Sequence, residues 1–380
     1  PPTPPTVRET PLSQTTVAQI LEALQPIVDP DLGKSIVDLG FVKNVVLDGA
    51  RVSFTIELTT PGCPVKAVFE REARGRVLAL EGIEDVEVEM SAATRGRTVS
   101  AEEVLPGVKN TIAVASGKGG VGKSTAAVNL AVALRATGAS VGLMDADVYG
   151  PSLPLLLGVW DHPHGEKRDG KEWIIPLEAH GLKLMSIGFL LTEDSPVIWR
   201  GPMVHGMIGQ FLCNVDWGEL DYLVIDLPPG TGDAALTLTQ QAPLSGAVVV
   251  TTANDLSLID ARKGLRMFEK VNVPVLGIVE NMSYFVPPDL PDRKYYIFGQ
   301  GGGKRTADEL GIDFLGEIPI DPQVVEGGDQ GKPIVTQVPD SPTAEAFREL
   351  AGAVARRLAV LASRSPAVAD ANITWSDSPG

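Results

Sequence analysis

The chain has little cysteine, little histidine and a deficit of basic charge. Among its 380 residues there are 2 cysteines and 4 histidines. Two cysteines are too few for a disulfide scaffold, and such a low number is typical of proteins from a reducing compartment. Lys and Arg together number 32 against 48 Asp and Glu, so the formal net charge is -16. A chain this acidic has little overall attraction for nucleic acid or an anionic membrane.

Long apolar runs and a targeting signal are missing as well. No run of about 18 apolar residues occurs, so we expect no transmembrane helix. The opening PPTPPTVRETPLSQ lacks the basic start and the apolar middle of a secretory signal. These absences predict a cytoplasmic protein that binds neither nucleic acid nor membrane. The composition is typical of a globular protein, because hydrophobic residues make up 44% and charged residues 21% of the chain.

The composition divides the chain into two folded units, a linker and two tails. Residues 1–13 are rich in Pro and Thr and have little to bury, so we expect a disordered tail there and another over 365–380. A small α+β domain is expected over 14–92. A polar linker follows over 93–109, and a larger domain spans 110–364.

The pattern of the small unit predicts a helix, two strands, a second helix and a third strand. Ile20, Leu24 and Val28 recur at helical spacing near its start. The two strands are joined by Asp48-Gly49, a dipeptide favoured in tight hairpin turns. The apolar face of the second helix is expected to comprise Val65, Val68, Phe69, Ala73, Val77 and Leu80.

The larger unit alternates short apolar runs with helical patterns. The runs are TIAVAS, SVGLMDA, YLVIDL, GAVVVTT, PVLGIVEN and DFLGEIP. Near-continuous apolar strands separated by helices indicate a parallel sheet that is covered on both faces. The predicted fold class is therefore α/β, with a doubly wound, mainly parallel sheet. A final helix over about 343–362 carries an apolar stripe that we expect to pack on this sheet.

The segment SGKGGVGKST contains the pattern G-x-x-x-x-G-K-[ST] over residues 117–124. A predicted strand precedes it and a predicted helix follows, as a phosphate-binding loop requires. Glycines let successive backbone N–H groups point at an anion, and the helix N-terminus adds a favourable dipole. Lys123 is expected against the β- and γ-phosphates of ATP, and the Ser124 hydroxyl on Mg²⁺. The residues expected to contact the nucleotide here are Gly117, Lys118, Gly119, Gly120, Val121, Gly122, Lys123, Ser124 and Thr125.

A Mg²⁺-nucleotide enzyme also needs a carboxylate at the end of a neighbouring strand. The run YLVID ends at Asp226, which is the expected second Mg²⁺ ligand. Asp145 and Asp147 close another predicted strand, and one of them could orient the attacking water. Asp147, which lies further along the loop, is the preferred candidate. The alternative for each strand-end Asp is a cap on the next helix.

Lys118, one position after the first glycine, distinguishes this loop from the ordinary version. In this respect the loop resembles the deviant Walker A loop of the MinD/ParA-like ATPases. In that group the corresponding lysine reaches across a dimer interface to the partner's nucleotide. The resemblance implies a homodimer and a catalytic role for Lys118, whereas the sequence alone also allows a solvated side chain.

Longer strings resemble one branch of that group, the Mrp/ApbC family of iron–sulfur cluster carrier ATPases. They are MDADVYGPSLP (144–154), IWRGPM (198–203), WGELDYLVIDLPPGTGDAALTLTQ (217–240), DARKG (260–264), ENMSYF (280–285) and IFGQGGG (297–303). The small unit is similar to the domain that occurs alone in SufT-like assembly factors. The resemblance covers nearly all of 14–364. It implies a slow ATPase that carries iron–sulfur clusters to apoprotein clients.

The resemblance also implies two contacts with the base of ATP. Asn281 would hydrogen-bond the adenine edge, which needs both a donor and an acceptor, and Pro319 would lie near the base. The alternative for Asn281 is a turn residue that ends a strand.

The cysteines depart from the family pattern. Most well-studied members place a Cys-x-x-Cys pair shortly after the ENMSYF string, and two such pairs bridge a [4Fe–4S] cluster across the dimer. Here that segment has no cysteine. Cys63 precedes a predicted helix, whose dipole favours thiolate, so it is the candidate cluster ligand; the alternative is a small buried side chain. Cys213 is expected in the core.

Two other functions stay open at this point. One is a MinD/ParA-like positional ATPase, although the last helix lacks the basic content of a lipid-binding helix. The other is an assembly adaptor that ATP gates and that holds no cluster itself.

Overall fold

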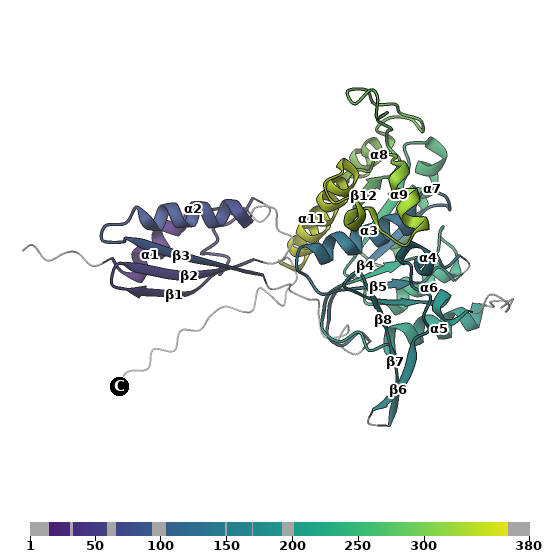
Figure 1. Ribbon diagram of the computed structural model, residues 1–380, viewed down its shortest axis with the longest axis horizontal. Helices are drawn as coiled ribbons and strands as arrows, with labels where there is room; N and C mark the ends of the chain where they lie inside the picture. Colours follow the sequence, from purple (N-terminus) through teal and green to yellow (C-terminus); the bar gives the residue numbers. More distant parts are fainter. Residues whose placement is uncertain are drawn as a thin grey trace, which may run out of the picture. The chain divides into compact units, whose positions relative to one another are not determined.

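A computed structural model describes residues 15–30, 33–58, 66–92, 104–148, 150–168, 170–191 and 201–363. These residues form two compact units, one that ends at residue 92 and one that begins at residue 104 (Figure 1). The described part of each unit has its own buried apolar side chains. The finer boundaries expected for the tails and the linker stay a prediction.

The described part of the smaller unit is a three-stranded sheet with two helices. Its elements are α1 (Val17–Leu24), β1 (Val42–Asp48), β2 (Arg51–Leu58), α2 (Lys66–Leu78) and β3 (Asp85–Ala92). The strand order is β1-β2-β3, with β1 antiparallel and β3 parallel to β2. Gly49, in the turn between β1 and β2, has a φ of 61°, which suits a tight hairpin. The predicted order of elements is confirmed.

Two of the apolar residues that were predicted on helical faces of this unit, Val28 and Val68, are exposed. α1 ends at Leu24, and Pro26 cannot donate the backbone hydrogen bond that would extend the helix. Val28 is 50% exposed, so the prediction that places it on the helical face is wrong. Val68 on α2 is also exposed, because only a narrow stripe of this helix faces the core.

In the described residues of the larger unit, eight strands form one sheet in the order β13-β12-β11-β4-β10-β5-β9-β8. Their bounds are β4 (Val108–Ser116), β5 (Val141–Asp145), β8 (Leu177–Ala179), β9 (Leu182–Ser186), β10 (Leu220–Asp226), β11 (Gly246–Thr251), β12 (Val275–Glu280) and β13 (Phe314–Glu317). The strands run parallel apart from β8, which is antiparallel to β9. The predicted doubly wound α/β fold is confirmed.

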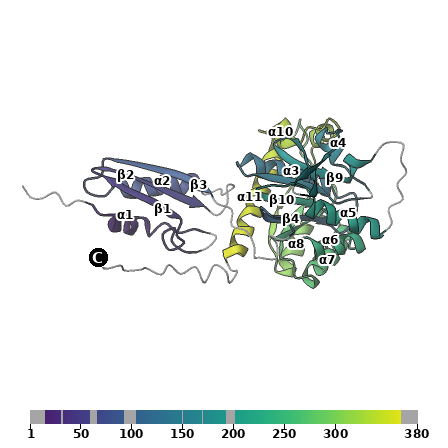
Figure 2. The same ribbon diagram turned by 90° about the horizontal axis from the view of Figure 1, so that it is seen from below.

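Helices cover both faces of this sheet (Figure 2). One face carries α3 (Lys123–Ala136), α4 (Leu153–Leu157), α10 (Ile334–Gln337) and α11 (Pro342–Ser363), and α9 (Pro322–Asp329) adjoins them. The other face carries α5 (Gly201–Cys213), α6 (Asp233–Gln241), α7 (Asp255–Lys270) and α8 (Gly302–Leu310). None of the helices in the described ranges combines the length and the apolar composition that a bilayer crossing requires.

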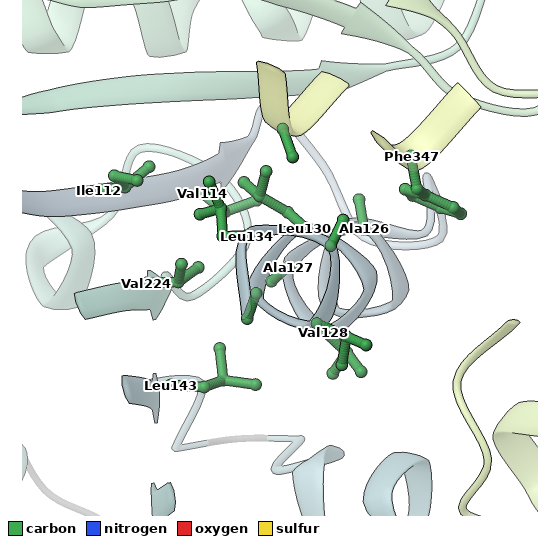
Figure 3. Close-up of a cluster of buried hydrophobic side chains, with 14 of the residues drawn as sticks. Ile112, Val114, Ala126, Ala127, Val128, Leu130, Leu134, Leu143, Val224 and Phe347 are labelled. Atoms are coloured by element: carbon green, nitrogen blue, oxygen red, sulfur yellow. The ribbon is translucent and has the colours of Figure 1, made fainter. Parts of the chain in front are cut away.

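α3 lies at the centre of the larger core, between the sheet and α11 (Figure 3). Every residue from Ala126 to Leu134 is buried, so the helix has apolar neighbours on all sides. Its alanines permit close approach, and Leu130 and Phe347 fill the space between α3 and α11. The apolar stripe of α11 thus packs against α3 as well as the edge of the sheet.

Two features of the larger unit carry no signal in the sequence pattern. β6 (His164–Arg168) and β7 (Lys171–Ile175) form an antiparallel hairpin outside the main sheet. All residues of β6 are exposed, so the strand shows no apolar alternation. The 3-10 helix η1 (Ile187–Leu190), which follows β9, is too short to produce a periodic pattern.

We predict that Phe347→Ala destabilises the larger unit by about 3–5 kcal/mol, because it leaves a cavity between α11 and α3. Urea unfolding followed by tryptophan fluorescence measures this unit alone, since all 5 tryptophans follow residue 95. Glu349→Ala, on the exposed side of the same helix, is the control and is expected to change stability by less than about 0.5 kcal/mol. Equal effects of the two changes would contradict this account of the core.

Candidate functional site

The glycine-rich segment 117–124 joins the end of β4 to the start of α3. β4 lies inside the sheet between β11 and β10, and these strands run parallel, so their carboxyl ends meet at one edge. This is the edge at which open α/β sheets bind ligands. The expected order of strand, loop and helix is therefore present, with α3 beginning at Lys123.

Two glycines of this loop are required by their surroundings. A Cβ on Gly117 would lie 2.1 Å from the backbone carbon of Asp260 in α7, so no larger residue fits there. Gly122 has a φ of 77°, and a Cβ on it would lie 2.2 Å from Nδ2 of Asn281. The loop is thus held against α7 on one side and against the end of β12 on the other.

The remaining residues of the loop differ in exposure. Gly119 and Gly120 are exposed, and Val121 is buried. Lys118 is half-buried, and its carbonyl oxygen accepts a hydrogen bond from the Ser116 hydroxyl at 2.9 Å. The half-buried residues of the first turn of α3 are Ser124 and Thr125.

Lys123 is the buried cation of the site. Its Nζ donates to Oδ1 of Asp226 at 2.5 Å and lies 3.5 Å from Oδ2 of Asp147. It also lies 3.3 Å from the Ser124 hydroxyl oxygen. The structure thus brings Asp147 and Asp226, from two other parts of the chain, to the consecutive residues Lys123 and Ser124.

Asp226, at the end of β10, is fully buried. Burial raises the pKa of its carboxyl, and the Lys123 ammonium opposes this shift. Its Oδ2 is buried without a hydrogen-bond partner, which is costly unless a ligand supplies one. A hard cation fits this position, because carboxylate and hydroxyl oxygens are the ligands that Mg²⁺ prefers.

Asp145, at the end of β5, differs from Asp147 in its surroundings. Its oxygens accept hydrogen bonds from Asp147, Ser152, Leu153 and Ser186. Burial and the charge of Asp226 raise the pKa of Asp145 to about 7. Asp147 is the one that lies beside Lys123.

Asn281 follows β12 and contacts the phosphate-binding loop. Its side-chain Nδ2 donates to the carbonyl oxygen of Val121 at 2.8 Å. The segment around Pro319 lies nearby, since the amide of Ile318 donates to the carbonyl of Glu280. The structure therefore brings Asn281 and the Pro319 segment together, and it places Asn281 on the loop itself.

One buried carboxylate at this edge was not found from the sequence. Glu280 is fully buried and accepts hydrogen bonds from the Ser283 hydroxyl and the Gly303 amide, both at 2.6 Å. It therefore ties the end of β12 to the start of α8. Its position as the last residue of an apolar run was the only available signal.

The structure describes one of the two cysteines, Cys213. Cys63 lies outside the described residues. Cys213 is exposed, so its expected place in the core is corrected: Phe211 and Leu212 fill the core where α5 ends, and Cys213 follows them outward. Among the residues that the structure describes, no group of three or more His, Cys, Asp and Glu side chains could hold a metal ion.

The site consists of a glycine loop between a buried parallel strand and a helix. Its buried lysine faces the end of the strand that lies beside the first one in the sheet. This arrangement defines a P-loop NTPase. The sheet order and the flanking helices give it the MinD/ParA-like fold. The larger unit is therefore a nucleotide-binding P-loop NTPase domain.

The chain belongs to the family described as NUBPL iron-transfer P-loop NTPase, which its residues 107–355 match. Residues 17–90 match the family described as iron-sulfur cluster assembly protein. The resemblance inferred from the sequence strings is thereby confirmed for both units.

Relatives of known name share nearly the whole chain. An iron-sulfur cluster carrier protein from Synechocystis is 50% identical over 355 residues, which are 91% of this chain and 99% of that protein. The chloroplastic Fe-S cluster assembly factor HCF101 from Arabidopsis thaliana is 47% identical over 92% of this chain and 65% of its own length. A solved nucleotide-binding protein from Archaeoglobus fulgidus in complex with ADP is 41% identical, with a TM-score of 0.56, over 65% of this chain and 95% of that one.

The raised pKa of Asp145 predicts a pH effect on stability in the absence of nucleotide and divalent cations. The folded carboxyl keeps its proton up to about pH 7, whereas an unfolded Asp loses it near about pH 3.9. The stabilisation from this group is therefore complete below about pH 4 and is lost as the pH rises through about 7. Urea unfolding across this range should show the unchanged chain losing stability relative to Asp145→Asn. A constant difference between the two chains would contradict the shift.

Proposed function

We propose that the chain is an ATP-binding and ATP-hydrolysing carrier or scaffold that delivers iron–sulfur clusters to apoprotein clients. The observation that carries the ATP part is the buried Lys123–Asp226 pair beside the glycine loop, with one Asp226 oxygen left without a partner. The carrier part is supported by the family of each unit and by the names of relatives that share nearly the whole chain.

The chain's own residues suggest how ATP is held. The backbone amides of residues 117–124 would face the phosphates, and the Lys123 ammonium would exchange its contact with Asp226 for one with the phosphates. Ser124 and Asp226 are the residues that would hold Mg²⁺, which neutralises phosphate charge when it is bound. Asp147 would orient the attacking water, since it lies beside Lys123 and is not saturated by backbone donors as Asp145 is. Asn281 and the Pro319 segment would border the base.

The homodimer is proposed because the loop with Lys118 resembles the deviant Walker A loop, in which the corresponding lysine reaches the partner's nucleotide. Lys118 directly follows a glycine that packs on α7, and its side chain is half-buried in the single chain. In the proposed assembly it contacts the nucleotide of the second copy. Closure of the dimer by ATP would then control when cargo or client is exposed.

The cluster would be the cargo of this carrier, and the family resemblance implies a [4Fe–4S] group. A cluster needs thiolate ligands, usually four. Each copy supplies 2 cysteines, Cys63 and Cys213, and Cys63 is the proposed ligand. A dimer with one Cys63 from each copy needs further ligands from the client or the solution. We also propose a cytoplasmic location, supported by the low cysteine content.

The positional ATPase is disfavoured, because the apolar stripe of α11 is covered. Phe347, Leu350, Val354 and Leu358 are buried in the core, so this helix does not offer them to lipid. The other candidate, an assembly adaptor that holds no cluster itself, is tested by reconstitution of the chain with iron and sulfide.

We predict that Lys123→Ala weakens ATP and ADP binding by roughly a hundredfold or more, because it removes the cation that meets the phosphates. Lys118→Ala is the matched change: it should keep nucleotide affinity within about threefold and lower ATP hydrolysis by roughly a hundredfold or more, as loss of a cation supplied in trans does. Calorimetry and phosphate release measure the two quantities. Normal binding by Lys123→Ala would overturn the assignment of the site.

We predict that the chain gains sulfide-dependent visible absorption when it is reconstituted with iron and sulfide without oxygen, and that it then activates an apoprotein client. Cys63→Ser should lose both properties, while Cys213→Ser, which changes the other thiol, keeps them. The reverse result would move the ligand to Cys213. If the unchanged chain takes up no cluster but still supports client activation in the presence of ATP, the adaptor function replaces the carrier.

A further inference from the structure

Asp145 is a buried side chain that accepts four hydrogen bonds when its carboxyl group is ionised. It is fully buried at the end of β5. Oδ1 accepts the amide of Asp147 at 3.0 Å, and Oδ2 accepts the amides of Ser152 at 3.1 Å and Leu153 at 3.4 Å. The Ser186 hydroxyl donates to Oδ2 as well, at 3.0 Å. A carboxylate offers about four lone-pair sites, so little capacity remains for water or substrate.

These hydrogen bonds join three parts of the chain. The Asp147 amide lies just after β5, and the amides of Ser152 and Leu153 open α4. Ser186 ends β9, and it pairs with Asp145 in the parallel register of the two strands. Asp145 thus holds both ends of the β5–α4 connection and attaches them to the neighbouring strand.

The held connection carries Asp147, which faces the reactive part of the site. Asp147 Oδ2 lies 3.5 Å from Lys123 Nζ, and this side chain is only 11% exposed. Its amide hydrogen bond to Asp145 fixes the backbone from which the carboxylate projects. A shift of about 1 Å in such a group can cost about a hundredfold in rate.

We propose that Asp145 is a positioning residue for ATP hydrolysis: it holds the β5–α4 connection so that the Asp147 carboxylate stays beside Lys123 and the phosphates. This inference rests on the proposed function. It assigns different roles to two acidic residues that are separated by one position. Asp147 orients the attacking water, and Asp145 keeps the Asp147 carboxylate in position.

Asp145→Asn tests the role with little change in volume. The amide can still accept from Asp147, but its NH₂ group would face the Ser152 and Leu153 amides, which are donors too. We expect kcat to fall roughly 10- to 100-fold, while KM for ATP and the calorimetric affinity for ADP change by less than about threefold. The number of ADP sites per chain corrects for any misfolded protein.

Asp221→Asn is the matched control. Asp221, in β10, is also a strand carboxylate that accepts from a backbone amide and a hydroxyl, those of Ser140 at 2.8 and 2.9 Å. It lies at the opposite edge of the sheet, near the start of β10. This change should lower the unfolding temperature without changing kcat per ADP site. An equal loss of kcat in both variants would show a general structural effect and overturn the proposal.

A double-mutant cycle with Asp147→Asn gives the decisive readout. If Asp145 acts through Asp147, adding Asp145→Asn to Asp147→Asn should lower kcat by less than about threefold further. Losses that multiply would overturn the proposal.

Should Asp145→Asn fail to fold, Ser186→Ala replaces it in the same cycle, with a smaller expected loss of roughly threefold in kcat. If the unchanged chain hydrolyses no ATP, the proposed function fails instead, and that result is distinct from a normal kcat in Asp145→Asn.

Discussion

The contact between the Lys123 ammonium and the Asp226 carboxylate is the interaction on which the site depends. Both groups are buried, and withdrawing either charge from water costs several kcal/mol unless a close partner offsets it. The contact requires β10 beside β4, because only then does the end of one strand face the loop that follows the other. The unpartnered Asp226 oxygen shows that the pair alone does not satisfy the site. A phosphate and a cation would complete it.

The rest of the larger unit holds this contact in place. Gly117 fits against the backbone of α7, and Asn281 crosses from β12 to the carbonyl of Val121. α3 carries Lys123 at its first position and is surrounded by apolar side chains along its length. Two buried carboxylates, Asp145 and Glu280, tie the connections at the edge of the sheet to neighbouring elements. The loop is therefore contacted by α7 and by the end of β12, and it continues directly into the buried helix α3.

Local patterns predicted much of this architecture correctly. The Asp48-Gly49 turn, the apolar parallel strands and the glycine loop each depend on residues close together in the chain, and each was found from them. Patterns failed where burial depends on distant neighbours. Val28 continues the helical spacing after the helix has ended, and Cys213 continues an apolar stretch just as α5 leaves the core. The exposed hairpin of β6 and β7 has no apolar period to detect.

The sequence by itself determined the nucleotide loop, the two units and the family, because motif spacing, periodicity and residue identity are properties of short stretches. The tertiary structure decided what each of two nearby carboxylates contacts. The sequence favoured Asp147 over Asp145 only because it lies further along the loop, whereas the structure shows that Asp145 accepts hydrogen bonds from β9 and the start of α4 and that Asp147 faces Lys123. Asn281 likewise acquires its contact from a loop 160 positions away. Such differences arise from long-range packing, which places donors and charges that no local pattern contains.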